Sequence, residues 1–140
     1  MILLDTNVIS ELWKPAPAPQ VLQWLDAQAT ETLFLSAITV AELRYGIAAM
    51  PNGKRRRIFQ ERLDAEVLPV FTNRVLPFDL AAAQSYAELM AKARAKGLAI
   101  ARADGLIAAI ATAHDLSVAT RDASPFEAAG VAVINPWVAR

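Results

Sequence analysis

The sequence contains no cysteine and a single histidine, His114, in 140 residues. These absences exclude disulfide bonds, thiolate catalysis, cysteine-based zinc sites and any metal site built from several histidines. No apolar run approaches the roughly 20 residues that a membrane-spanning helix requires. The strand-like segment that follows Met1 directly leaves no room for a signal peptide, so we expect a cytoplasmic protein without a membrane association.

The chain also lacks an excess of charge of either sign. With 14 basic and 14 acidic residues, its net charge of zero gives no bulk signal for nucleic-acid binding. Apolar residues make up 55% of the chain and exclude disorder, and the length predicts one domain over residues 1–140. One basic cluster, residues 54–57, is interpreted as a solvated helix start, with contact to a nucleic-acid backbone as the alternative.

Short apolar segments alternate with segments of helical periodicity along the chain. No Asn-Gly or similar hairpin signal joins two strands, so the alternation predicts a parallel sheet flanked by helices. The expected strands are 2–4, 32–37, 74–79, 116–120 and 130–135, and the main expected helices are 6–13, 38–50, 54–68, 80–96 and 102–114.

Acidic residues follow several of these strands or begin the next helix. Asp5, Asp79 and Asp122 come directly after expected strands. Glu42 lies one turn into a helix, and Asp104 lies at the start of another. Because open parallel sheets bind ligands at the carboxyl ends of their strands, these acids are expected to converge on one edge.

Each acid also has a purely structural interpretation. Asp5 and Asp79 are good helix N-caps, and capping is preferred for Asp79. Residues 39–42 and 124–127 both fit a capping box, in which the last side chain reaches back to the helix start. Asp104 would be stabilised by the helix dipole.

Taken together, the acids favour a metal site. Glu42 and Asp104 stand among apolar residues, where an unpaired carboxylate is costly, and no basic residue is obviously placed to pair with the whole set. Carboxylates without histidine or cysteine are the ligands of Mg²⁺ or Mn²⁺. Such ions activate water and stabilise the leaving oxygen in phosphodiester hydrolysis.

Polar residues beside two of the acids are candidates for supporting roles. Thr6 and Asn7 follow Asp5, and Thr120 and Arg121 precede Asp122. These side chains would orient a carboxylate, hold a water or touch a phosphate. For Thr120, the alternative is an ordinary strand residue.

Four separated motifs carry a family resemblance. MILLDTNVISEL, SAITVAELRYGI, ARADGLIAAIATAHDLSVATRD and GVAVINPW, in this order, resemble the PIN domain, and in particular the VapC-type toxins of bacterial toxin–antitoxin pairs, FitB-like members among them. The resemblance covers nearly the whole chain. It implies a three-layer α/β/α sandwich with a central, mainly parallel sheet, and a single PIN domain over residues 1–140.

The resemblance also implies a function and partners. PIN-domain toxins are Mg²⁺- or Mn²⁺-dependent ribonucleases, and by motif the four acids would be Asp5, Glu42, Asp104 and Asp122. Such toxins usually form homodimers. They pair with a small VapB- or FitA-like antitoxin, whose C-terminal segment reaches the acidic site and whose N-terminal domain binds operator DNA.

One departure from the family pattern keeps a second function open. Many VapC-type chains read TRNxxDF, whereas this chain reads TRDASPF, so that Asp122 holds the asparagine position and Pro125 the aspartate position. The alternative is a protein of low activity that mainly completes an antitoxin–DNA repressor complex. A phosphatase with Asp5 as nucleophile is disfavoured, because Asn7 stands where its second aspartate belongs, and a phospho-receiver domain lacks its paired acids.

Aromatic and apolar residues outside the acidic set receive structural interpretations. Trp13, Trp24 and Trp137 are predicted to be core or interface anchors rather than base-stacking platforms. The helix over 38–50, with the next helix, is a candidate groove for an antitoxin helix. His114 is interpreted as a helix-terminal residue.

Overall fold

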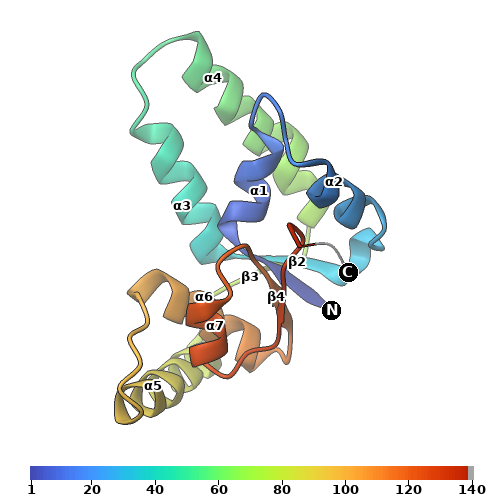
Figure 1. Cartoon of the computed structure of the whole chain (residues 1–140). Coiled ribbons are helices and arrows are strands. Elements are labelled where there is room, and N and C mark those ends of the chain that lie inside the picture. Colours follow the sequence, from blue (N-terminus) through green and yellow to red (C-terminus); the bar gives the residue numbers. More distant parts are fainter. Residues whose placement is uncertain (139–140) are drawn as a thin grey trace.

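The computed structural model describes residues 1–138, in which a five-stranded sheet lies between two layers of helices (Figure 1). The strand order is β3-β2-β1-β4-β5, and every pairing is parallel. This confirms the three-layer α/β/α architecture expected from the sequence. The strands are β1 (Ile2–Leu4), β2 (Leu33–Ser36), β3 (Val75–Leu76), β4 (Ser117–Ala119) and β5 (Val133–Ile134).

Helices α1 to α4 lie on one side of the sheet in Figure 1, and α5 to α7 lie on the other. None of the helices in the described part of the chain combines the length and apolar character needed to cross a bilayer. The helices are α1 (Thr6–Leu12), α2 (Pro19–Asp26), η1 (Thr30–Thr32), α3 (Ala37–Ala48), α4 (Lys54–Glu61), η2 (Arg62–Val67), η3 (Leu68–Phe71), α5 (Leu80–Ala95), α6 (Arg102–Ala113) and α7 (Ser124–Ala128).

Two expectations about the elements need correction. The strands expected over 74–79 and 130–135 are much longer than β3 and β5, which pair over two residues each. The helix expected over 54–68 is divided into α4, the π-helical η2 and the 3₁₀-helical η3, and it continues to Phe71. Pro69 explains the change of geometry, because proline cannot donate the backbone hydrogen bond of an α-helix interior.

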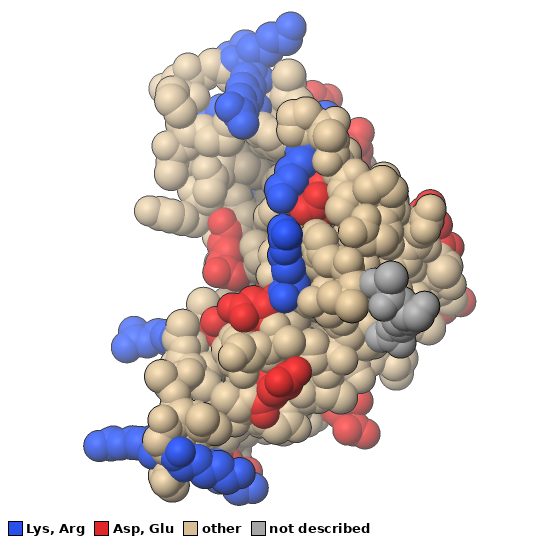
Figure 2. Space-filling model, in the orientation of Figure 1, with Lys and Arg blue, Asp and Glu red and all other residues tan. Residues whose placement is uncertain are grey.

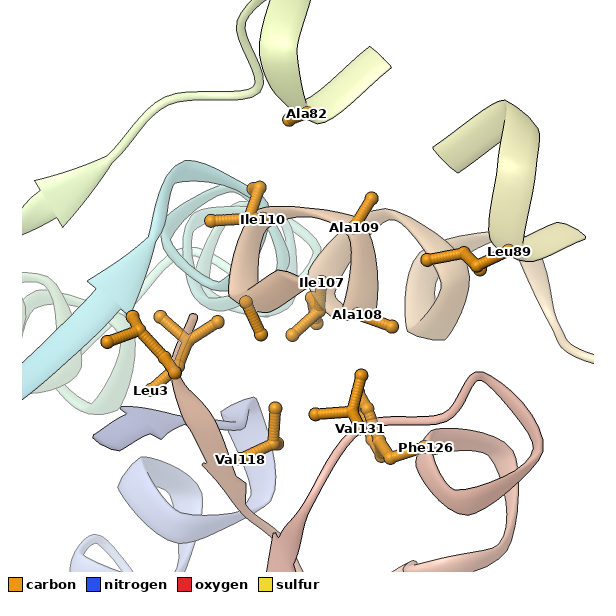
Figure 3. Close-up of a cluster of buried hydrophobic side chains, with 12 residues drawn as sticks. Leu3, Ala82, Leu89, Ile107, Ala108, Ala109, Ile110, Val118, Phe126 and Val131 are labelled. Carbon is orange, nitrogen blue, oxygen red and sulfur yellow. The ribbon is translucent and has the colours of Figure 1, made fainter. Parts of the chain in front are cut away.

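The core has two halves, one on each face of the sheet. Successive strand residues point to opposite faces, so Leu3 joins one cluster and Leu4 joins the other. Figure 3 shows the first cluster, in which Leu3 and Val118 of the sheet face α6, and Phe126 of α7 closes one side. The three tryptophans pack as partly buried residues against the second cluster, which confirms that they contribute to the core, and each keeps part of its surface exposed.

The strand order places a topological switch point between β1 and β4. From β1 the chain crosses to β2 and then to β3, whereas β4 and β5 lie on the other side of β1. In open parallel sheets the crevice at such a point is the usual ligand site. Asp5 and Asp122 follow the two strands that border this crevice.

Candidate active site

Asp5 lies at the centre of the site, with 6% of its surface exposed. It is the N-cap of α1, as expected, because its Oδ1 accepts a 2.8 Å hydrogen bond from the backbone N–H of Thr6. Its Oδ2 accepts hydrogen bonds from Thr120 Oγ1 at 2.9 Å and from Asn7 Nδ2 at 3.4 Å. Asp5 therefore caps its own helix and also bonds across the switch point to the end of β4.

The two loops that flank the switch point are held together by Asn7 and Thr120. Asn7 Nδ2 donates to Thr120 Oγ1 at 3.2 Å, and Asn7 Oδ1 accepts from the backbone N–H of Arg121 at 3.3 Å. The fully buried Thr120 hydroxyl also accepts from the backbone N–H of Asp122 at 3.1 Å. Asn7 and Thr120 thus fix the orientation of Asp5 and the path of the chain into Asp122.

Glu42 does not form the capping box expected over residues 39–42, so that prediction is wrong. Ser36 is the N-cap of α3, and its side chain accepts from the backbone N–H of Thr39 at 3.0 Å. Glu42 Oε1 instead accepts a 2.6 Å hydrogen bond from Thr6 Oγ1. Thr6 thereby links Glu42 to the loop of Asp5.

Thr39 is a residue of this network that the sequence interpretation missed. Its hydroxyl oxygen is fully buried and lies 3.1 Å from Thr6 Oγ1 and 3.3 Å from Ser36 Oγ. A signal for it was available, because Ser36 directly precedes the helical pattern and serine is a preferred N-cap. Placing the cap at Ser36 frees the Thr39 hydroxyl to hold Thr6.

Asp104 belongs to a helix on the other face of the sheet from α1, and Asp122 follows a strand of the sheet. Asp104 lies in the first turn of α6, whose N-cap is Ala101, and Asp122 lies in the exposed bend after β4. The capping box expected over 124–127 is also wrong, because Ala123 is the N-cap of α7 and no side chain caps that helix. This bend is therefore held by hydrogen bonds with Thr120 and Asn7 and not by a cap.

Asp79 stands apart from the acidic set. Its Oδ1 accepts a 3.0 Å hydrogen bond from the backbone N–H of Ala82, so it is the N-cap of α5. This confirms the preferred interpretation of Asp79 as a cap. At the same edge, Asn135 after β5 was not singled out from the sequence, although its Nδ2 donates to the backbone carbonyl of Arg121 at 3.4 Å.

The four remaining acids influence one another electrostatically. Burial, reinforced by the charges of Asp104 and Glu42, raises the pKa of Asp5 to about 6, even though the hydrogen bonds that Asp5 accepts lower it in part. Burial also raises the pKa of Asp104, with further contributions from Asp122 and Glu42. Figure 2 shows acidic side chains at the hollow between the upper and lower parts of the molecule, with basic side chains beside them.

None of the ion pairs within the described residues, 1–138, neutralises this group. Within residues 1–138 the ion pairs join Lys14 to Glu11 and Arg44 to Asp64, and neither pair includes an acid of the site. Within the same residues, no three acidic side chains lie close enough together to form a metal-binding cluster. The donor set nevertheless fits Mg²⁺ or Mn²⁺, because Mg²⁺ is commonly bound through one or two carboxylates and keeps several waters.

The raised pKa of Asp5 predicts how folding stability depends on pH. The folded protein keeps a proton on Asp5 up to about pH 6, whereas the unfolded chain releases it near pH 3.8. The stabilisation from this group is therefore complete below about pH 3.8 and is lost, by about 3 kcal/mol, as the pH rises through 6.

Urea unfolding of the metal-free protein between pH 4 and 7 measures this effect, and Asp5→Asn is the reference that lacks the carboxyl group. The stability difference between the two proteins should shift in favour of Asp5→Asn as the pH rises. A difference that is constant across this range would contradict the raised pKa.

The fold and the site together define a class of protein: a parallel α/β/α sandwich with carboxylates gathered at its topological switch point. Residues 2–131 match the family model of the PIN domain, and the chain belongs to the PIN domain family.

Named relatives and solved structures resemble the chain over almost its whole length. It is 68% identical over 137 residues to VapC ribonuclease Y4jK of Sinorhizobium fredii, covering 98% of both chains. It is 54% identical to Toxin FitB of Neisseria gonorrhoeae, covering 98% of this chain and 99% of FitB. A chain in the structure of FitAB bound to the IR36 DNA fragment superposes with a TM-score of 0.97 at 51% identity, covering 100% of this chain and 98% of that one.

Proposed function

We propose that this protein is the ribonuclease toxin of a toxin–antitoxin pair and hydrolyses RNA phosphodiester bonds with Mg²⁺ or Mn²⁺. The observation that carries the proposal is the group of four acids at the switch point of a PIN fold, where burial and like charges raise the pKa of Asp5 to about 6. A buried carboxylate among like charges is stabilised in its charged form when a cation binds beside it.

Asp5, Glu42, Asp104 and Asp122 would hold the metal, one or two of them directly and the others through its bound waters. When bound, the metal would supply an activated water and charge stabilisation for the leaving oxygen. The protein's own groups prepare the site in two ways. Thr120 and Asn7 hold the Asp5 carboxylate in one orientation, and Thr6 holds Glu42.

Arg121 is placed to contact a substrate phosphate near the acids. Its guanidinium lies 5.5 Å from the centroid of the Trp137 ring, and its backbone N–H donates to Asn7 Oδ1. The aromatic ring supports the cation without neutralising its charge. The charge of Arg121 therefore stays available to an anion at the edge of the site.

The partners proposed for this chain follow from its relatives. We infer a VapB- or FitA-like antitoxin that covers the acidic site and binds operator DNA, so that the toxin reaches DNA only through the antitoxin. A homodimer in the cytoplasm, where the RNA lies, is part of the same proposal. Light scattering of the purified toxin and of its complex with the antitoxin would measure both stoichiometries.

The test is RNA cleavage by the antitoxin-free protein with and without a divalent metal. We expect cleavage with Mg²⁺ or Mn²⁺, complete loss with excess EDTA, and recovery when the metal is added back, because water activation depends on the metal. Undiminished cleavage in EDTA would disprove the metal-dependent mechanism. If the folded protein cleaves none of several RNAs with either metal, the alternative of a low-activity antitoxin partner gains support. The TRDASPF segment, which departs from the family pattern, would then be the first explanation to test for the lack of activity.

A further inference from the structure

A groove leads away from the acidic site between α1, α3 and α4. Its volume is about 210 Å³, and Thr6 and Glu42 of the site form part of its lining. Trp13 and Phe59 line it as well, with ring centroids 5.5 Å apart and ring planes at 48°. The groove therefore connects the proposed metal ligands to an aromatic wall.

Gly46 leaves room in this groove. It lies within α3, and a Cβ atom at this position would meet nothing within 4 Å. Glycine weakens a helix interior, and no close packing requires it here. The open space at Gly46 lies beside apolar side chains of Ile47 and Met50, which suits a flat, apolar group.

The aromatic wall also borders a basic cleft. Trp13 and Phe59 line a second hollow of about 800 Å³, which Arg55 and Arg62 share. Each guanidinium lies 5.6 Å from the centroid of the Phe59 ring. Neither arginine forms an ion pair within residues 1–138, although Glu66 lines the same cleft.

We propose that this groove binds one base of the RNA substrate against the Trp13–Phe59 wall, and that Arg55 and Arg62 bind the backbone phosphates beyond it. The inference rests on the proposed ribonuclease function and names how its substrate is held. Single-stranded nucleic acids bind where aromatic side chains stack on bases and cations follow the backbone. The order of acids, apolar groove and arginines along one path matches a scissile phosphate, a base and further phosphates.

Arg55 and Arg62, at the end of this path away from the acids, favour a polyanion over an apolar peptide helix as the occupant of the groove. Arginine contacts to phosphate give affinity that falls with salt, whereas an apolar helix gains little from two unpaired guanidinium groups. Lys14 lines the cleft too, but its charge is paired with Glu11 at 2.9 Å. Arg55 and Arg62 are therefore the cations to test.

The first experiment measures kcat and KM for a short single-stranded RNA whose cleaved bond has been mapped. Gly46→Leu places a side chain in the groove, and its Cβ atom would meet nothing within 4 Å. We expect the new side chain to exclude the base and to raise KM about tenfold or more, which corresponds to the loss of one base stack. Arg55→Gln with Arg62→Gln should also raise KM and flatten its dependence on salt. Lys92→Gln with Arg94→Gln on α5 also removes two exposed charges, and this matched control should leave KM unchanged.

The second experiment identifies the base itself. Substrates with one abasic nucleotide at each position next to the cleaved bond are compared in the wild type and in Gly46→Leu. At one position, removing the base should raise the KM of the wild type about tenfold and have little further effect on Gly46→Leu, because both changes remove the same contact.

The outcomes separate this inference from the proposed function. If wild-type protein cleaves RNA but Gly46→Leu and the arginine variants keep the KM of the wild type, the groove does not hold substrate and the inference is overturned. An antitoxin complex that Gly46→Leu disrupts while KM is unchanged would assign the groove to a protein partner instead. If the wild type cleaves no RNA, the proposed function fails first.

Discussion

Replacing Asp5 or Asp104 by asparagine is expected to lower the rate of RNA cleavage by roughly 10²–10³-fold or more. Each substitution keeps the shape of the side chain but removes a charge that the divalent metal requires. Cleavage of a labelled single-stranded RNA under single-turnover conditions with Mg²⁺ measures the effect. Thermal unfolding in the absence of metal should show both variants folded, because removing a carboxylate relieves repulsion within the acidic group.

Glu31→Gln is the control for this prediction. Glu31 is exposed and lies just before β2, at the edge of the sheet opposite the acidic site. The Glu31→Gln substitution also removes one negative charge, and this variant should cleave RNA at the rate of the wild type. Cleavage by folded Asp5→Asn and Asp104→Asn at the rate of Glu31→Gln would refute the assignment of both residues.

Phe126→Ala is expected to lower the free energy of unfolding by about 3–5 kcal/mol, which is the usual cost of emptying a large aromatic site in a core. Phe126 is fully buried, and Figure 3 shows it beside Val131 and near Val118, below α6. It is the only buried residue of α7, so it attaches that helix to the sheet. Urea unfolding followed by circular dichroism measures the loss.

The matched control for the core is Leu80→Ala. Leu80 is 90% exposed at the start of α5, and its truncation should change stability by less than about 0.5 kcal/mol. Equal losses in the two variants would mean that α7 is not held by Phe126. Because α7 begins two residues after Asp122, Phe126→Ala should also weaken RNA cleavage at temperatures where the variant remains folded.

The hydrogen bonds at the site show how local capping and function coexist. Asp5 uses one oxygen to cap α1 and the other to bond Thr120, which lies 115 residues away along the chain. Its role as a cap therefore does not compete with its role at the site. Glu42 differs, because it takes no part in the cap of α3, which Ser36 forms, and accepts a hydrogen bond from Thr6 instead.

Several features of the protein are determined by local sequence. The alternation of Leu3 and Leu4 between two cores follows from the period of a strand, and Asp79 caps α5 because its oxygen reaches an N–H three residues away. Strands ending in acids predict an acidic edge, since parallel strands share one carboxyl side. These features depend on contacts within a few residues or on a repeating pattern.

Tertiary structure alone decided the remaining features. The order β3-β2-β1-β4-β5, which brings Asp5 next to Thr120, is selected by the packing of all helices on both faces, and no single segment encodes it. The pairing of Glu42 with Thr6 spans 36 residues and overrides a local capping pattern that the sequence also satisfies. The groove at Gly46 exists only because α1 and α4 meet α3 at that place. Local patterns specify short-range hydrogen bonds, whereas the choice among long-range partners depends on the summed burial of the whole chain.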